Sequence, residues 1–161
     1  MGTVSETVIE GAAAPDFALP TTEGRTVRLS EYRGRPVVIY FYPADDTPGC
    51  TTQACGLRDN YARITDSDAV VLGISPDDVE SHARFATKFG LPFLLLSDED
   101  HAISEQFGVW KNRGVYGWGI ERSTFIIAPD GMVRHAWRRV KADTHAERVI
   151  EALREMEGPK D

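Results

Sequence analysis

The 161-residue sequence has only two cysteines, Cys50 and Cys55, and too few metal-binding side chains at suitable spacings for a structural metal site. A structural zinc ion takes four Cys or His ligands. The sequence has neither a second cysteine pair nor two histidines separated by three residues. We therefore expect no bound metal.

Long hydrophobic runs and basic regions are also missing. The strongest apolar run covers residues 37–41, far too short to cross a bilayer. Residues 1–14 show no basic start followed by an apolar stretch, so we expect no secretory signal and a cytoplasmic location. The net charge of -7 argues against nucleic acid or an anionic membrane as the main partner. In a cytosolic protein, two close cysteines indicate catalysis rather than a structural staple.

The chain length suits one domain with a full hydrophobic core. No internal repeat, low-complexity segment or long linker interrupts the sequence. We predict a single domain over residues 1–161, with residues 1–13 as a loose N-terminal segment.

Apolar residues alternate between strand-like and helix-like spacing along the chain. Strands are expected in two pieces over 16–29, which would form a hairpin, and over 37–42, 69–74, 92–96, 123–128 and 132–138. Helices are expected over 50–64, from the start signal at 75–78 to Gly90, in a short piece after 97–100, and over 144–156. Residues 109–121 are expected to form a loop. This order predicts an α/β sandwich around a mixed sheet.

Cys50 follows the turn-forming residues 43–49 and lies in the first turn of the helix expected from residue 50. A helix start presents unpaired backbone N–H groups and a partial positive charge. Such a position favours the thiolate, which is the reactive form of cysteine. Residues 43–55 therefore indicate redox chemistry.

The side chains around Cys50 suit the attack of a thiolate on a peroxide. That reaction spreads negative charge from sulfur onto two oxygens, so the site needs fixed hydrogen-bond donors. The hydroxyl of Thr47 can donate and accept, and Pro43 can form a rigid apolar wall that limits water. A cation is still required to hold the thiolate and the leaving oxygen.

The spacing Pro43-x3-Thr47-x2-Cys50 resembles the active-site signature of the peroxiredoxins, which are thiol-dependent peroxidases with a thioredoxin-like fold. Further motifs resemble the bacterioferritin comigratory protein, or Q-type, subfamily over about residues 14–153: 41–43, 47–51, 53–59, 72–75, 96–98 and 107–110. The resemblance implies a thioredoxin-like three-layer sandwich with a mixed central sheet and an N-terminal β-hairpin. It also implies that Arg122, before the strand at 123–128, supplies the missing cation, and that no cofactor is needed. Gln53 stands where other peroxiredoxins often carry Glu.

The resemblance also gives Cys55 a role, because Q-type proteins often carry a resolving cysteine at this spacing. In an ideal helix, residues five apart have Cα atoms about 8.6 Å apart, whereas a disulfide requires roughly 4.4–6.8 Å. A Cys50–Cys55 disulfide would therefore require the first helical turns to unwind. Thr51, Thr52 and Gly49, all poor helix formers, ease that step. Thioredoxin is the reductant that the resemblance implies, and the subfamily is often monomeric.

Other interpretations are kept open. The same residues could serve a thiol–disulfide oxidoreductase, although such enzymes carry Cys-x2-Cys, or a non-enzymatic redox sensor or holdase. Thr47 could simply cap the helix. The four histidines share no ligand spacing and are expected on the surface. Trp118 is the best tryptophan candidate to border the substrate entrance.

Overall fold

A five-stranded mixed sheet forms the centre of the protein, which is described by a computed structural model for residues 8–22 and 24–157. Strand β3 (Val37–Phe41) lies in the middle and is flanked by the parallel β4 (Val70–Ser75) and the antiparallel β8 (Ser123–Ile127). The edges are β5 (Leu94–Ser97), parallel to β4, and β9 (Val133–Arg138), antiparallel to β8. Every residue of β3 and β8 is buried, as expected for central strands covered on both faces. The mixed sheet predicted from the sequence is confirmed.

Alternate residues of β3 face two separate cores, because successive side chains of a strand point to opposite sides. On one side lie helices α1 (Pro48–Asp59), α2 (Tyr61–Thr65), α3 (Val79–Phe89) and α5 (His145–Glu157). Val38 and Tyr40 belong to this core, together with Leu57, Phe85 and Val149 from the helices. Cys50 is part of the same core.

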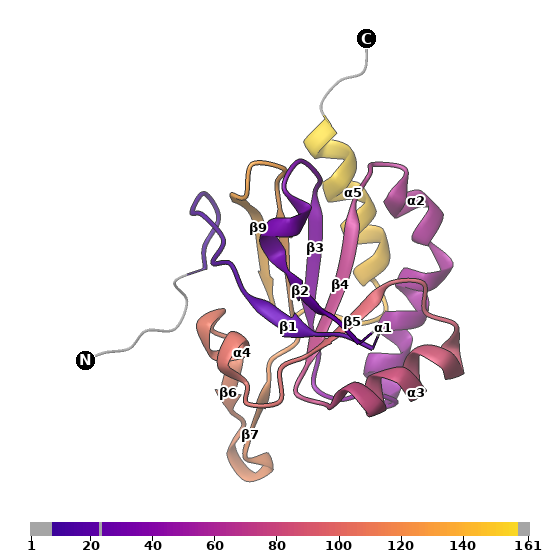
Figure 1. Cartoon of the computed structure of the whole chain (residues 1–161), viewed down its shortest axis with the longest axis vertical. Helices are drawn as coiled ribbons and strands as arrows, with labels where there is room; N and C mark the ends of the chain where they lie inside the picture. Colours follow the sequence, from indigo (N-terminus) through magenta and orange to yellow (C-terminus); the bar gives the residue numbers. More distant parts are fainter. Residues whose placement is uncertain (1–7, 23, 158–161) are drawn as a thin grey trace, which may run out of the picture.

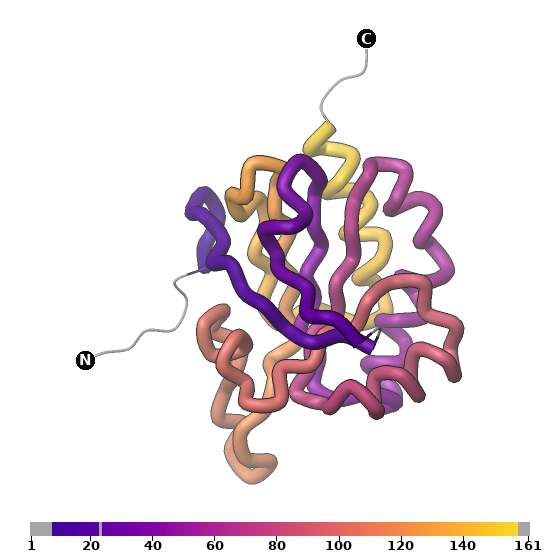
Figure 2. The backbone as a smooth tube through the Cα atoms, in the orientation of Figure 1, coloured from indigo at the N-terminus to yellow at the C-terminus, as the bar shows by residue number. Residues whose placement is uncertain are grey.

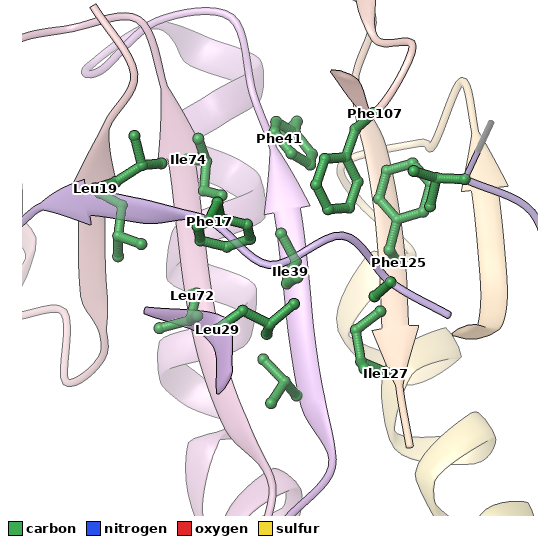
Figure 3. Close-up of a cluster of buried hydrophobic side chains, with 14 of the residues drawn as sticks. Phe17, Leu19, Leu29, Ile39, Phe41, Leu72, Ile74, Phe107, Phe125 and Ile127 are labelled. Carbon is green, nitrogen blue, oxygen red and sulfur yellow. The ribbon is translucent and has the colours of Figure 1, made fainter. Parts of the chain in front are cut away.

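The opposite face carries the second core and the N-terminal hairpin. Strands β1 (Ala18–Pro20) and β2 (Thr26–Arg28) pair antiparallel and are followed by the 3-10 turn η1 (Leu29–Tyr32). Helix α4 (Ala102–Gln106) lies on this side as well. Figure 1 shows the hairpin crossing one face of the sheet while α1 and α5 lie behind it. Figure 3 shows Phe17 and Leu29 packing on side chains of β3, β4 and β8. Three layers result, as predicted.

The helix that carries both cysteines differs from the prediction in two ways. It begins at Pro48 rather than at residue 50, since proline at the first helical position has a suitable fixed φ and needs no N–H partner. It also ends at Asp59, and α2 continues after Asn60, which has φ -111° and ψ 14°. The Asn60 Nδ2 donates to the Gly56 carbonyl at 2.9 Å. This side-chain bond competes with the helical backbone pattern, so the predicted single helix over 50–64 is wrong.

Residues 109–121 form a hairpin instead of the predicted loop. Strand β6 (Trp110–Asn112) pairs antiparallel with β7 (Trp118–Ile120) around the short turn η2 (Gly114–Tyr116). Gly114 and Gly117 have φ of 68° and 76°, a region that glycine enters without strain. Three-residue strands with an exposed tip give too little alternation to be read from the sequence.

The expected loose segment over 1–13 lies partly outside the described residues, which begin at Val8. Gly11 N donates to Val133 O at 2.9 Å, and Val133 N donates to Ala12 O at 2.8 Å. Figure 2 shows this indigo segment beside the orange hairpin of β8 and β9. Residues 11–13 are therefore fixed to the sheet edge. Among the helices of the described part, none is long and apolar enough to cross a membrane.

Candidate active site

Cys50 lies in the first turn of α1, directly beyond the carboxyl end of the central strand. Thr47 is the N-cap residue, with φ -103° and ψ 156°, and its carbonyl accepts the first helical bond from Thr51 N at 2.8 Å. The backbone N–H of Cys50 is thus among the first four of the helix, which have no partner within it. The thiol is only 1% exposed and is free.

Arg122, which immediately precedes β8, is the cation next to this sulfur. Its Nη2 donates to Cys50 Sγ at 3.4 Å, and its Nη1 donates to Gln53 Oε1 at 2.6 Å. The two bonds hold the guanidinium plane against the first turn of α1. Gly49 leaves room for this approach, since a Cβ there would lie 3.0 Å from Nη2, closer than most such contacts.

The Thr47 hydroxyl can accept a further hydrogen bond but cannot donate one. Its Oγ1 donates its only hydrogen to the Ala44 carbonyl at 2.9 Å, which leaves the oxygen lone pairs for another group. The side chain makes no capping bond to α1. The interpretation of Thr47 as a simple side-chain cap is therefore wrong.

Pro43 lines a groove of about 400 Å³ that also involves the β6–β7 hairpin. The other lining residues are Pro76, Trp110, Arg113, Tyr116, Trp118, Gly119 and Ile120. Trp118 thus borders the same groove as Pro43. A second cavity, of about 460 Å³, is lined by Arg122 and includes the basic residues Lys111, Arg113 and Arg139.

Cys55 lies on the same continuous helix as Cys50, is half-buried and is also free. With α1 intact, the two residues have helical separation, which is too long for a disulfide. The structure therefore represents the reduced, fully folded arrangement.

Three buried polar atoms among the described residues have no hydrogen-bond partner: Tyr40 Oη, Gln53 Nε2 and His145 Nδ1. Gln53 is oriented by Arg122, because a guanidinium only donates and must face the amide oxygen. Burial raises the pKa of Tyr40, and the neighbouring Cys50 adds to the shift. Burial, with the positive charges of Arg122 and Arg148, lowers the pKa of His145 to about 3. His145 is therefore neutral and bonds Thr124 Oγ1 through Nε2 at 2.7 Å.

The prediction that all four histidines lie on the surface is wrong for His82 and His145, which are 0% and 1% exposed. The sequence does contain a signal for both. His82 is three residues before Phe85, and His145 is four residues before Val149, so each shares the apolar face of its helix. The surface prediction rested on the absence of ligand spacing and did not consider the position of each histidine on its helix.

Asp45, Asp77 and His82 are the described residues whose ligand atoms come close enough to suggest a metal site, within 4.8 Å of one another. Protein donors already occupy these atoms. Asp45 Oδ2 lies 2.7 Å from His82 Nδ1, and Asp77 Oδ2 accepts from Asp45 N at 2.8 Å. The cluster is thus a hydrogen-bond network.

Comparison with protein families and with curated proteins finds close relatives. The model of the AhpC/TSA family matches residues 11–136. Peroxiredoxin Bcp of Bacillus subtilis is 46% identical over 153 residues, which cover 93% of this chain and 98% of the relative.

Solved structures with the same arrangement are also known. A PrxQ cysteine-to-serine mutant from Xylella fastidiosa superimposes with a TM-score of 0.91 at 35% identity, over 95% of this chain and 99% of that chain. The bacterioferritin comigratory protein of Xanthomonas campestris, described with its alkyl peroxide reduction activity, gives a TM-score of 0.83 at 40% identity. That match covers 87% of this chain and 91% of the other.

Proposed function

The chain belongs to the AhpC/TSA family and is a peroxiredoxin, a thiol-dependent peroxidase, and from this premise we propose that Cys50 is the thiol that attacks the peroxide. Membership in the family confirms the predicted thioredoxin-like α/β fold. The observation that carries the proposal is the 3.4 Å contact between Arg122 Nη2 and Cys50 Sγ. Arg122 is permanently charged, so it can stabilise the negative charge that spreads from the sulfur to the oxygens during the attack.

The attack step transfers one oxygen atom. The Cys50 thiolate donates an electron pair to the terminal oxygen of ROOH, the S–O bond forms and the O–O bond breaks. The released RO⁻ takes a proton from solvent, so that a thiol and ROOH give a sulfenic acid and ROH. Arg122 remains charged throughout and stabilises the negative charge that develops on the leaving oxygen.

Thr47 and Pro43 prepare the peroxide for this attack. Because the Thr47 hydroxyl donates to Ala44 O, its oxygen can accept a hydrogen bond from the ROO–H group and orient the terminal oxygen. Pro43 lines the groove next to the site and limits water there. Each residue acts by positioning, so neither has to change its own protonation state.

The substrates we propose are hydrogen peroxide and small organic hydroperoxides. The groove of about 400 Å³ beside Pro43 is bordered by Trp110, Trp118 and Ile120, which suit the alkyl part of a hydroperoxide. A relative of known structure, the Xanthomonas campestris protein, is described as reducing alkyl peroxides.

Cys55 resolves the sulfenic acid in the proposed cycle. Its thiolate attacks the Cys50 sulfur, the S–S bond forms, and the oxygen leaves as water after protonation. The first turns of α1 must unwind to bring the sulfurs together. A dithiol of the thioredoxin type then reduces the disulfide and is itself oxidised. The proposed cycle needs cysteines that can be kept reduced, which suits a cytoplasmic location. We also propose that the protein is a monomer, which sedimentation would test.

Intact-mass analysis after one equivalent of hydrogen peroxide tests this cycle. Wild-type protein should lose two hydrogens within seconds and regain them with thioredoxin. The Cys55→Ser variant should stop at a sulfenic acid on Cys50, which a dimedone-type reagent traps. If both proteins remain reduced, the assigned site is wrong.

A thiol–disulfide oxidoreductase is less well supported by the geometry. Cys50 is 1% exposed, and a protein disulfide is too large to reach it while α1 is folded. An insulin-reduction assay distinguishes the two enzymes, since a peroxidase should leave insulin intact. A sensor or holdase would instead react slowly with peroxide and would not turn over with reductant.

A further inference from the structure

The loop between β3 and α1 is held by a buried hydrogen-bond network that the chemistry above does not use. Asp45 lies in the middle of this loop, between Pro43 and Thr47, yet its side chain is only 4% exposed. A charged carboxylate is rarely buried unless it is paired. The partners of Asp45 therefore show which parts of the fold hold the loop in place.

The Asp45 carboxylate accepts three hydrogen bonds. They come from Tyr42 Oη at 2.5 Å, from Ser81 Oγ at 2.7 Å and from His82 Nδ1 at 2.7 Å. The backbone N of Asp45 donates to Asp77 Oδ2 at 2.8 Å. This loop residue is thereby bound to the end of β3, to α3 and to the turn after β4.

Both ring nitrogens of His82 are engaged. Its Nε2 lies 3.1 Å from the Leu96 carbonyl of β5, and its Nδ1 lies 2.7 Å from Asp45 Oδ2. The imidazole therefore bridges the loop to β5. Burial alone would raise the pKa of Asp45, but the hydrogen bonds from His82 and Tyr42 and the charge of His82 outweigh it and lower that pKa. The Asp45 carboxylate is thus held in place by hydrogen bonds from several elements.

A buried polar pair is weak evidence for stability, because removing polar groups from water offsets most of what their hydrogen bonds contribute. Such pairs are better attested as devices that select one conformation. Here the selected feature is the path of the loop. Asp46, the next residue, adopts φ 56°, a left-handed conformation that needs support from its surroundings.

Resting on the proposed peroxidase cycle, we propose that Asp45 and His82 are positioning residues for the peroxide step. They hold the loop so that Thr47 and Pro43 face Cys50. When the first turns of α1 unwind, residue 45 is the point at which the chain remains fixed. They touch neither peroxide nor Cys50. Their loss should slow the attack on peroxide without slowing disulfide formation, which requires the loop and α1 to leave this arrangement.

The test compares Asp45→Asn, His82→Gln and the double variant with wild type. Rapid-quench mass analysis gives the rate constant for oxidation of Cys50 and, separately, the rate constant for disulfide formation. The matched control is Lys88→Met. Lys88 also joins α3 to the loop, through Asp46 at 2.8 Å, but both side chains are about half exposed, and such pairs contribute little.

We expect the oxidation rate constant to fall about tenfold in each single variant, since displacing a positioned group by 1 Å can cost up to 10²-fold. Disulfide formation should be at least as fast as in wild type. The double variant should be no slower than the slower single variant, because the two residues act as one unit. Lys88→Met should leave both steps unchanged.

Oxidation within about twofold of wild type in folded Asp45→Asn would overturn the proposal. So would an equal loss of both steps together with a lower melting temperature, because that pattern indicates a purely structural role. If these variants do not fold, Ser81→Ala provides a milder test, because it removes one donor to Asp45. It should slow the oxidation of Cys50 by less than tenfold and leave disulfide formation unchanged. If Ser81→Ala does not slow oxidation, the proposal fails.

Amide hydrogen exchange at residues 44–50 separates this proposal from the peroxidase assignment, because it needs no peroxide. Faster exchange there in Asp45→Asn, but not in Lys88→Met, supports the proposal that Asp45 holds the loop. If wild type fails to react with peroxide, the proposed active site is wrong. If exchange is unchanged in Asp45→Asn, the proposed role of Asp45 is wrong.

Discussion

Gly49 leaves room for Arg122: a Cβ at residue 49 would lie 3.0 Å from Arg122 Nη2, so the guanidinium would have to shift by a few tenths of an ångström. The same nitrogen reaches Cys50 Sγ. The position of the cation therefore depends on a residue that takes no part in the chemistry.

Gly49→Ala should slow the oxidation of Cys50 while leaving the protein at least as stable as wild type. Alanine is favoured over glycine within a helix by about 0.5–1 kcal/mol, but the methyl group displaces the guanidinium. We expect a loss of about tenfold in the peroxide rate constant, since small displacements at a reacting centre are costly. Stopped-flow tryptophan fluorescence measures the rate and urea unfolding the stability. An unchanged rate would show that Arg122 adjusts freely.

Arg122→Lys should cost more, because an ammonium cannot bond Cys50 Sγ and Gln53 Oε1 with one rigid plane. Removing one fixed donor from a reacting anion typically costs about 10²–10³-fold, and we expect the peroxide rate constant to fall at the lower end of that range. Arg63→Lys is the matched control, since Arg63 pairs with Glu147 on the surface. Equal rates for both variants would contradict the assigned role.

Thr52→Ala should slow disulfide formation and leave oxidation unchanged. Thr52 is exposed in the segment of α1 that must unwind, and alanine stabilises a helix by about 0.5 kcal/mol relative to threonine. That energy corresponds to about a twofold slower step. The control is Thr65→Ala in α2, beyond Cys55. Time-resolved mass analysis measures the rate of disulfide formation in both variants. Equal rates would refute the unwinding step.

His145 should make the protein less stable in mild acid. Its pKa falls from an ordinary 6.5 to about 3 in the folded protein, so below pH 6.5 the unfolded chain binds a proton that the folded chain excludes. Stability from this group is full above pH 6.5 and falls towards pH 3, by about 2 kcal/mol at pH 5. Asp45 also has a pKa lowered from an ordinary 3.8, so its contribution is lost only as the pH falls through that value, below the pH 5 used for the comparison.

Urea unfolding at pH 7.5 and pH 5 measures this effect. His145→Gln should be less stable than wild type at pH 7.5, because the Thr124 bond is disturbed, but it should lose about 2 kcal/mol less on acidification. If the two proteins show equal pH dependence, His145 is protonated in the folded state.

The local part of the site could be predicted from the sequence, whereas the long-range part could not. The turn residues before Cys50 and the apolar spacing after it predicted a helix start, and the structure has one at Pro48. Arg122 was identified only through resemblance, because no pattern near residue 122 points to residue 50. Their contact depends on the pairing of β3 with β8, which places Ser123 opposite Phe41.

The buried polar groups were missed for a related reason. The helix spacing can indicate that a histidine is buried, but not which groups it bonds, and the partners of His82 come from residues 45 and 96. The hairpin of β6 and β7 was missed because its strands have only three residues each. In both cases the deciding contacts were absent from the local pattern.

The separation of 72 residues between Cys50 and Arg122 has a consequence during synthesis of the chain. A ribosome completes Cys50, Thr47 and α1 well before it reaches β8, so the nascent thiol has no guanidinium beside it. The cysteine acquires that cation only once β8 has paired with β3. The contact between Cys50 and Arg122 is thus a property of the finished chain and not of its first half.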